Sequence, residues 1–253
     1  DAPALKKADI GVAMGITGTE VSKGAAVMIL TDDNFATIVK AVEFGRAIYQ
    51  NLFNFVRFQM ESLVAFIISY LLAAFFVVLG GAPFTPFVVL WINFLVQIPV
   101  ALALGFDDPP PNLMEHKPRP LKQPILTTAQ WIRIAFIGLL MSIATIYLEA
   151  VYEASGVAVA ATMGMVVFSL MVVILALSAR SETASAFNRN VLKNRHQLML
   201  YGISLLMTII PVRFGWLGLT QITSEQWLIC IAFAFALLLV DEVIKFFIRR
   251  SRS

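Results

Sequence analysis

The sequence is poor in charge and almost without cysteine. Only 14% of its 253 residues are charged and 59% are hydrophobic, whereas an ordinary soluble domain has about a quarter charged and about half apolar residues. This composition excludes a single water-soluble globule. The one cysteine, Cys230, excludes an intrachain disulfide. It lies in an apolar run, where we interpret it as a packing residue and not as a reactive thiol.

The first residues have neither a starting Met nor a basic stretch followed by an apolar core. We therefore expect no signal peptide and expect the chain to be cut from a longer one.

Apolar residues are abundant instead. Twenty Phe residues and a mean hydropathy of +0.82 predict helices that are apolar on all sides, which is typical of membrane spans. Six charge-poor stretches approach or exceed the ~20 residues that cross a bilayer. They are residues 58–79, 86–106, 131–149, 157–179, 197–215 and 226–244. At the ends of two of these spans, Arg133 and Lys245 are expected to extend toward water.

Basic residues lie on one side of this six-span arrangement. All but one of the 19 Lys and Arg residues fall on the side of both termini, and the exception is Arg213. By the positive-inside rule, the sequence predicts a multi-pass membrane protein with both termini in the cytoplasm. The formal charge of +3 is thus explained by topology, and membrane lipid is the expected partner, with no nucleic acid.

Residues 1–45 differ from the rest. The pattern predicts a strand at 10–14, a helix at 17–26 and a strand at 27–30, and the run Asp32-Asp33-Asn34 is typical of a helix cap. This alternation indicates the edge of an α/β domain, which upstream sequence would complete. Residues 46–253 are expected to form a stalk helix and six membrane helices. The predicted fold is therefore mainly α, with a small α/β remnant at its start.

Polar residues inside a membrane are costly and are functional candidates. Asn93 and Gln97 lie four apart, on one face of an α-helix. Pro99 has no N–H, so the Leu95 carbonyl loses its usual partner and becomes a third oxygen at this level. Glu61 and Ser62, at the inner end of the first span, add a carboxylate and a hydroxyl. This set predicts a cation site between the first two spans. Alternatively, Asn93 and Gln97 only hold helices together through hydrogen bonds.

The opening run DAPALKKADIGVAMG resembles the end of the phosphorylation domain of P-type ATPases, where a Thr-Gly-Asp-Gly-Val-Asn-Asp block precedes Ala-Pro-Ala-Leu. Asp1 matches the last Asp of that block. The resemblance covers nearly the whole chain and points to the calcium-pump-like branch. Further matches are residues 32–35 (DDNF), 45–49 (GRAIY), 90–93 (LWIN), 103–106 (ALGF), 118–120 (PRP) and 241–246 (DEVIKF).

The resemblance implies a carboxy-terminal fragment of an ATP-driven cation pump. It would comprise the end of a HAD-like phosphorylation domain and the last six membrane helices, and it would partner the missing amino-terminal half of the same chain. ATP and Mg²⁺ would be the cofactors in the full-length protein, with Asp1 near Mg²⁺ or else only ordering its loop. The sequence has no Asp-Lys-Thr-Gly-Thr motif, so the phosphorylated Asp would lie upstream. We expect no catalytic residue here and no ATP hydrolysis by the fragment alone.

Several positions depart from the calcium pumps of this family. Where those pumps carry Asn and Glu in the first of these spans, this sequence has Leu63 and Phe66. In the second span it keeps Asn93 but has Val96 and Gln97 in place of Thr and Asp, and an apolar residue near Val172 replaces a Glu of the fourth. Since Ca²⁺ prefers several anionic oxygens, we expect one of two calcium sites to be absent and leave the transported cation open.

Two other interpretations remain. The chain could be a six-span passive or secondary cation carrier, although it shows no inverted repeat between its halves. It could also be a non-catalytic relative that keeps the fold as a scaffold.

Overall fold

A computed structural model describes the chain except residues 108–112, 116, 121, 182–185, 187–193 and 253. It contains two compact units, one comprising residues 1–50 and 109–118 and the other residues 51–108 and 119–253. Helix α3 (Ala36–Phe76) contributes to both units.

The first unit contains a strand, a helix and a parallel strand. Strand β1 (Val12–Met14) pairs with β2 (Met28–Leu30), with Ala13 opposite Ile29. Helix α2 (Glu20–Ala25) connects them, and its N-cap Thr19 accepts a hydrogen bond from the Ser22 N–H. The expected strand–helix–strand order is thus present, in shorter elements than the sequence suggested. Helix α1 (Ala2–Lys7), which has a proline in its first turn, was not predicted from the sequence.

Asp33 ties the end of β1 to the turn after β2. Its carboxylate accepts hydrogen bonds from the backbone N–H of Ile16 (2.8 Å) and Thr17 (2.8 Å) and from the Thr17 hydroxyl (2.7 Å). Its φ of 48° lies in the left-handed region, which Asp tolerates better than most residues. The hydrogen bond from Ile16 N–H is the main reason that the pKa of Asp33 is lowered from its ordinary value of 3.8.

Because the pKa of Asp33 is lower in the folded protein than in the unfolded chain, its carboxylate stabilises the fold fully above pH 3.8. This stabilisation is lost as the pH falls through the pKa of Asp33 in the folded protein. We expect Asp33→Ala in the full-length protein to open residues 15–19 to limited proteolysis at neutral pH, whereas the parent opens there only in acid. Asp9→Ala, which removes an exposed carboxylate from the loop before β1, is the control. Equal cleavage of both variants would contradict this role for Asp33.

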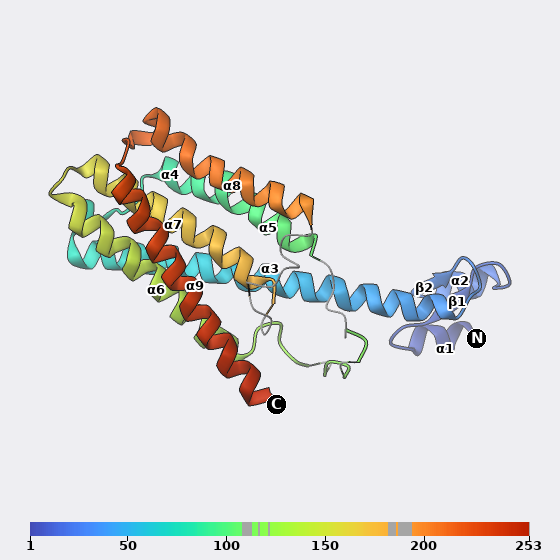
Figure 1. The fold of residues 1–253 in the computed structure, drawn as a ribbon. Coiled ribbons are helices and arrows are strands. Elements are labelled where there is room, and N and C mark those ends of the chain that lie inside the picture. Colours follow the sequence, from blue (N-terminus) through green and yellow to red (C-terminus); the bar gives the residue numbers. More distant parts are fainter. Residues whose placement is uncertain (108–112, 116, 121, 182–185, 187–193, 253) are drawn as a thin grey trace. The chain divides into compact units, whose positions relative to one another are not determined.

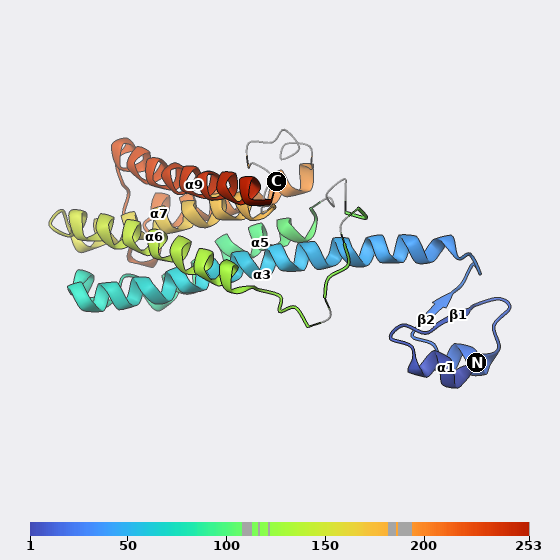
Figure 2. The same ribbon diagram turned by 90° about the horizontal axis from the view of Figure 1, so that it is seen from below.

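The second unit is a bundle of helices (Figures 1 and 2). Among the described residues, six helical segments are long and apolar enough to cross a membrane, and the mainly α polytopic fold predicted from the sequence is confirmed. They are α3; α4 (Pro86–Trp91), η2 (Ile92–Gln97) and α5 (Ile98–Gly105) as one span; α6 (Thr128–Glu153); α7 (Val157–Ala179); α8 (Arg195–Phe214); and α9 (Ser224–Arg252). Short 3-10 turns, η1 (Val78–Gly81) and η4 (Trp216–Gly218), follow α3 and α8.

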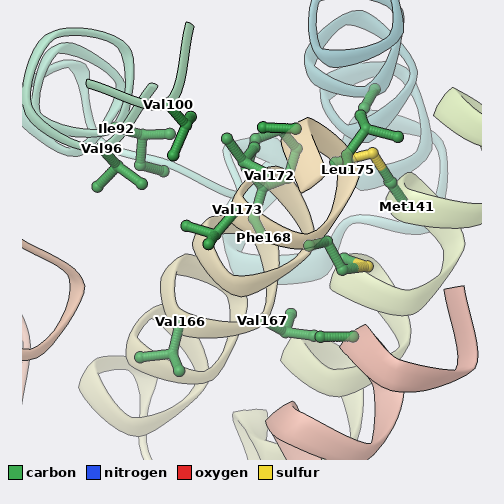
Figure 3. Close-up of a cluster of buried hydrophobic side chains, with 14 of the residues drawn as sticks. Ile92, Val96, Val100, Met141, Val166, Val167, Phe168, Val172, Val173 and Leu175 are labelled. Carbon is green, nitrogen blue, oxygen red and sulfur yellow. The ribbon is translucent and has the colours of Figure 1, made fainter. Parts of the chain in front are cut away.

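Helix α7 is the centre of the bundle. Of its apolar window 67% is buried, the largest share among the six spans, and it packs against α6 and α9. Figure 3 shows Ile92 and Val96 of the second span on the side that faces Val172 and Val173 of α7. By contrast, α3 presents an uncovered apolar stripe at a spacing of four residues, formed by Leu63, Ile67, Leu71 and Phe75, as expected of a helix surrounded by lipid or by other membrane helices.

Side chains of two other helices cap the end of α7. Arg57 of α3 donates to the Ala179 carbonyl (2.8 Å), Asn54 of α3 donates to the Arg180 carbonyl (2.8 Å), and Lys245 of α9 donates to the Ser178 carbonyl (2.9 Å). The last carbonyls of a helix have no partner within it and form the negative end of its dipole. Two cations and an amide therefore satisfy this terminus and join α3, α7 and α9.

A buried ionic cluster lies beside this terminus. Asp241 of α9 pairs with Arg133 of α6 and with Lys245 (3.6 Å), and it accepts a hydrogen bond from the Ser178 hydroxyl. Asp241 and Lys245, four residues apart on α9, thus form an ion pair. The expectation that Arg133 and Lys245 extend to water is wrong, because both are buried and paired with an anion on α9.

Candidate cation site between the first two spans

The second span is not a continuous α-helix at the candidate site. Residues Ile92–Gln97 form the π-helical segment η2, in which each N–H bonds five residues back instead of four, an arrangement that often marks functional sites. The α-helical geometry assumed for Asn93 and Gln97 is therefore wrong in detail. Helix α8 holds this segment, since the Ser204 hydroxyl donates to the Val96 carbonyl (2.7 Å).

Gln97 connects the second span to the first. Its side chain is 2% exposed, and its Nε2 donates to Oε1 of Gln59 on α3 (3.0 Å). Its own Oε1 is buried and has no hydrogen-bond partner among the described residues. The amide group thus joins helices through its nitrogen and still offers an oxygen. Both interpretations of Gln97 from the sequence remain compatible with this geometry.

Asn93 is only half-buried, and its Nδ2 donates to the Val89 carbonyl of its own span (2.8 Å). This hydrogen bond orients the side chain but does not join two helices. The Leu95 side chain is exposed, while Pro99 in α5 provides no N–H for the Leu95 carbonyl four residues earlier.

Ser62 and Glu61 point in different directions. Ser62 is fully buried, its Oγ has no described partner, and it follows Gln59 by three residues, which places the two on one helix face. Glu61 follows Gln59 by two residues and so faces elsewhere. It lies 4.0 Å from Arg57, and the charges of the ionic cluster also act on it. Gln97 thus contacts Gln59, and Ser62 lies on the same face of α3 as Gln59. Glu61 lies on another face, toward the ionic cluster.

Glu61, expected at the inner end of its span, is buried, and neither of its carboxylate oxygens accepts a hydrogen bond from a described residue. Gln59 was not among the residues predicted from the sequence. Its position three residues before Ser62 was the available signal.

The positions that depart from the calcium pumps lie largely in the apolar core. The Phe66 ring packs against the rings of Phe84 (5.6 Å between centroids) and Phe168 (4.3 Å). Val96 and Val172 are fully buried (Figure 3). Leu63 instead faces outward and is 48% exposed. Phe66, Val96 and Val172 thus pack as hydrocarbon side chains, and the absence of one of the two calcium sites stays a prediction.

Asp1 belongs to the first unit. It is exposed and occupies the N-cap position of α1, but its carboxylate makes no capping hydrogen bond to that helix. Within the described part of the chain, no three His, Cys, Asp or Glu side chains are grouped as metal ligands. Any cation site of these residues must therefore rely mainly on amide, hydroxyl and carbonyl oxygens.

Six apolar helices with buried polar groups at their centre define an integral, multi-pass membrane protein with a small α/β unit. A family profile described as "Cation transporting ATPase, C-terminus" matches residues 81–247. The chain belongs to this family of cation-transporting ATPases.

Curated relatives are similar along nearly the whole chain. It is 36% identical to Calcium-transporting ATPase 1 of Bacillus cereus over 97% of this chain, and 37% identical to Calcium-transporting ATPase 1 of Schizosaccharomyces pombe over 99%. It is also 33% identical to Calcium-transporting ATPase 8, plasma membrane-type, of Arabidopsis thaliana over 91%. The chain spans only 30%, 28% and 22% of these three relatives.

Proposed function

We propose that this chain is the carboxy-terminal transport region of an ATP-driven P-type cation pump, and that the cation is bound between its first two spans. The observation that supports this site most directly is the pair of buried oxygens without partners, Gln97 Oε1 and Ser62 Oγ, on two spans joined by the Gln97–Gln59 hydrogen bond. Buried polar atoms are normally satisfied, and a bound cation would provide these two oxygens with a partner.

The remaining ligands follow from the same segment. Asn93 and the Leu95 carbonyl add oxygens from the second span. Glu61 is next to Ser62 in the sequence and carries a carboxylate. Its ion pair with Arg57 (4.0 Å) makes that carboxylate less available as a cation ligand. A hard divalent cation takes six to eight oxygens, so the full pump would have to add ligands from helices outside this chain.

ATP and Mg²⁺ would act at the cytoplasmic side of the full-length protein, where Mg²⁺ neutralises charge on the transferred phosphoryl group. Asp1 suits this role as far as one carboxylate can, since it is exposed and unused by α1. We also propose that both termini face the cytoplasm, because all but one of the 19 basic residues fall on the side of the termini in the six-span arrangement predicted from the sequence.

The test is ATP-driven transport by the full-length protein that contains this chain, reconstituted in vesicles. We expect ATP to drive accumulation of a cation, with radiolabelled Ca²⁺ as the first probe, since the relatives are named as calcium-transporting, and Mn²⁺ as the second. A sealed vesicle without ATP is the control. Cation flux that is equal with and without ATP would favour the passive carrier, and the absence of any flux would favour the scaffold.

A further inference from the structure

Glu149 of α6 is a carboxyl group that the proposed cation site does not use. It is 0% exposed, and neither of its oxygens has a hydrogen-bond partner among the described residues. It makes no ion pair in the described part of the chain. A buried carboxylate without a compensating cation is strongly disfavoured, so the neutral acid is the form that this environment accepts.

Among the residues that the structure describes, no cationic side chain pairs with Glu149. Helix α7, which packs against it, contains no titratable side chain between Val157 and Ala179. Tyr70 of α3 and Glu153 of α6 are the titratable groups that act on it. The Tyr70 hydroxyl donates to the Phe84 carbonyl (2.8 Å). Turn η1 has none in its sequence Val-Leu-Gly-Gly. Glu153, as a second acid, favours the neutral form of Glu149 further.

The carboxyl group of Glu149 is in tight contact with the neighbouring helix. Its carboxyl group packs directly on Gly164 of α7, and a Cβ atom at Gly164 would lie 1.9 Å from Glu149 Oε1. A metal ion needs several oxygens at 2.0 Å or more around it, whereas a proton needs no such shell. On the side of Gly164 the packing leaves no room for a metal ion, whereas a proton fits there.

Glu153 lies one turn further along the same face of α6. It is half-buried, and its Oε1 accepts a hydrogen bond from the Leu79 N–H of η1 (3.1 Å). This second carboxyl connects the buried group with the end of the bundle at η1. Ionisation of Glu149 would require water or a new partner, and hence a separation of α6 from α7 at Gly164.

We propose that Glu149 is a reversible proton-binding site of the pump and that protons reach it through Glu153. Glu149 releases its proton when the α6–α7 contact at Gly164 opens. This inference rests on the proposed function for its role in transport. The step is a proton transfer between the carboxylic acid and water, with no other bond changed.

The experiment uses the reconstituted full-length protein and the variant Glu149→Gln, an isostere of the neutral acid, with Glu225→Gln at an exposed acid of α9 as the matched control. Infrared difference spectra between cation-loaded and cation-free protein should contain a carboxylic-acid band that disappears in Glu149→Gln and persists in the control. Proton movement, followed with a pH dye inside the vesicles, should fall by one proton per cycle in Glu149→Gln while cation transport continues.

If the band disappears but the proton count stays unchanged, the band reports a change in the surroundings of a Glu149 that stays neutral, and the proposal is wrong. If no band is lost, Glu149 keeps one protonation state in both forms of the protein, and the proposal is also wrong. If Glu149→Gln does not fold, Glu149→Asp gives a second assignment, because its shorter acid should shift the frequency of the band, and an unshifted band would overturn the proposal. A failure of ATP-driven cation transport in the parent would instead contradict the proposed function, while the infrared result would still decide whether Glu149 exchanges a proton.

Discussion

Asp241→Asn is expected to destabilise the bundle by about 3–5 kcal/mol, the range for removing one partner of a buried ion pair. The physical reason is that Arg133 and Lys245 both pair with this carboxylate while buried. Lys245 also donates to the Ser178 carbonyl and Asp241 accepts from the Ser178 hydroxyl, so the change loosens the end of α7 as well. The measurement is the midpoint of thermal unfolding in detergent, with retention of the folded form on gel filtration.

Arg249→Met is the control for this prediction, because it removes an exposed cation from the same helix and should change stability by no more than about 0.5 kcal/mol. The double variant Arg133→Met, Asp241→Leu removes one cation together with the anion. Lys245 then keeps Glu242 (3.3 Å) as its partner. The double variant should therefore be more stable, by about 0.5–3 kcal/mol, than the sum of the effects of Arg133→Met alone and Asp241→Leu alone predicts. Additive effects would show that Arg133 and Asp241 do not depend on each other.

Hydropathy alone was sufficient to predict the spans, because a helix in lipid must be apolar over a fixed length whatever its neighbours are. The ionic cluster could not be predicted in this way. Arg133 and Asp241 lie in different helices 108 positions apart, and a charge near the end of an apolar stretch looks the same whether it extends to water or meets a partner. Only the packing of α6 against α9 distinguishes the two cases.

The candidate site was predictable as a set of residue types but not as a geometry. A polar amide in an apolar run is conspicuous, and so Asn93 and Gln97 could be selected. The π-helical turn around them is not encoded in any spacing that the sequence displays, since it depends partly on Ser204 of α8 bonding to the Val96 carbonyl. Similarly, the separation of Glu61 from Ser62 follows from which helices surround α3.

Glu149 shows another limit of the sequence. It stands near the end of a predicted span, where an acid is ordinarily solvated. Its burial follows from the absence of a side chain at Gly164 on the neighbouring helix, a complementarity between two spans that neither span displays by itself.

Gln97→Leu is expected to weaken activation by the transported cation about ten- to hundredfold. The change removes the buried Oε1 and the hydrogen bond to Gln59, and leaving a buried polar partner unmet costs about 1–3 kcal/mol, where each factor of ten in affinity corresponds to about 1.4 kcal/mol. Asn93→Ala should act in the same direction by removing one oxygen. The measurement is the cation concentration for half-maximal ATPase activity of the full-length pump.

A second measurement and a control variant distinguish the loss of a cation ligand from the loss of the folded structure. Phosphorylation from inorganic phosphate, which needs no transported cation, should survive in both variants, and Leu63→Ala should change neither measurement because its outward-facing side chain has no oxygen. Gln97→Glu keeps the length of the side chain and adds an anionic oxygen, so activation by a divalent cation should occur at a lower concentration than in the parent.

If Gln97→Leu and Asn93→Ala left cation activation unchanged, both amides would serve only to position helices, because an oxygen that binds the cation cannot be removed without cost. The ligands would then have to come from Glu61, Ser62 and the helices of the pump that lie outside this chain.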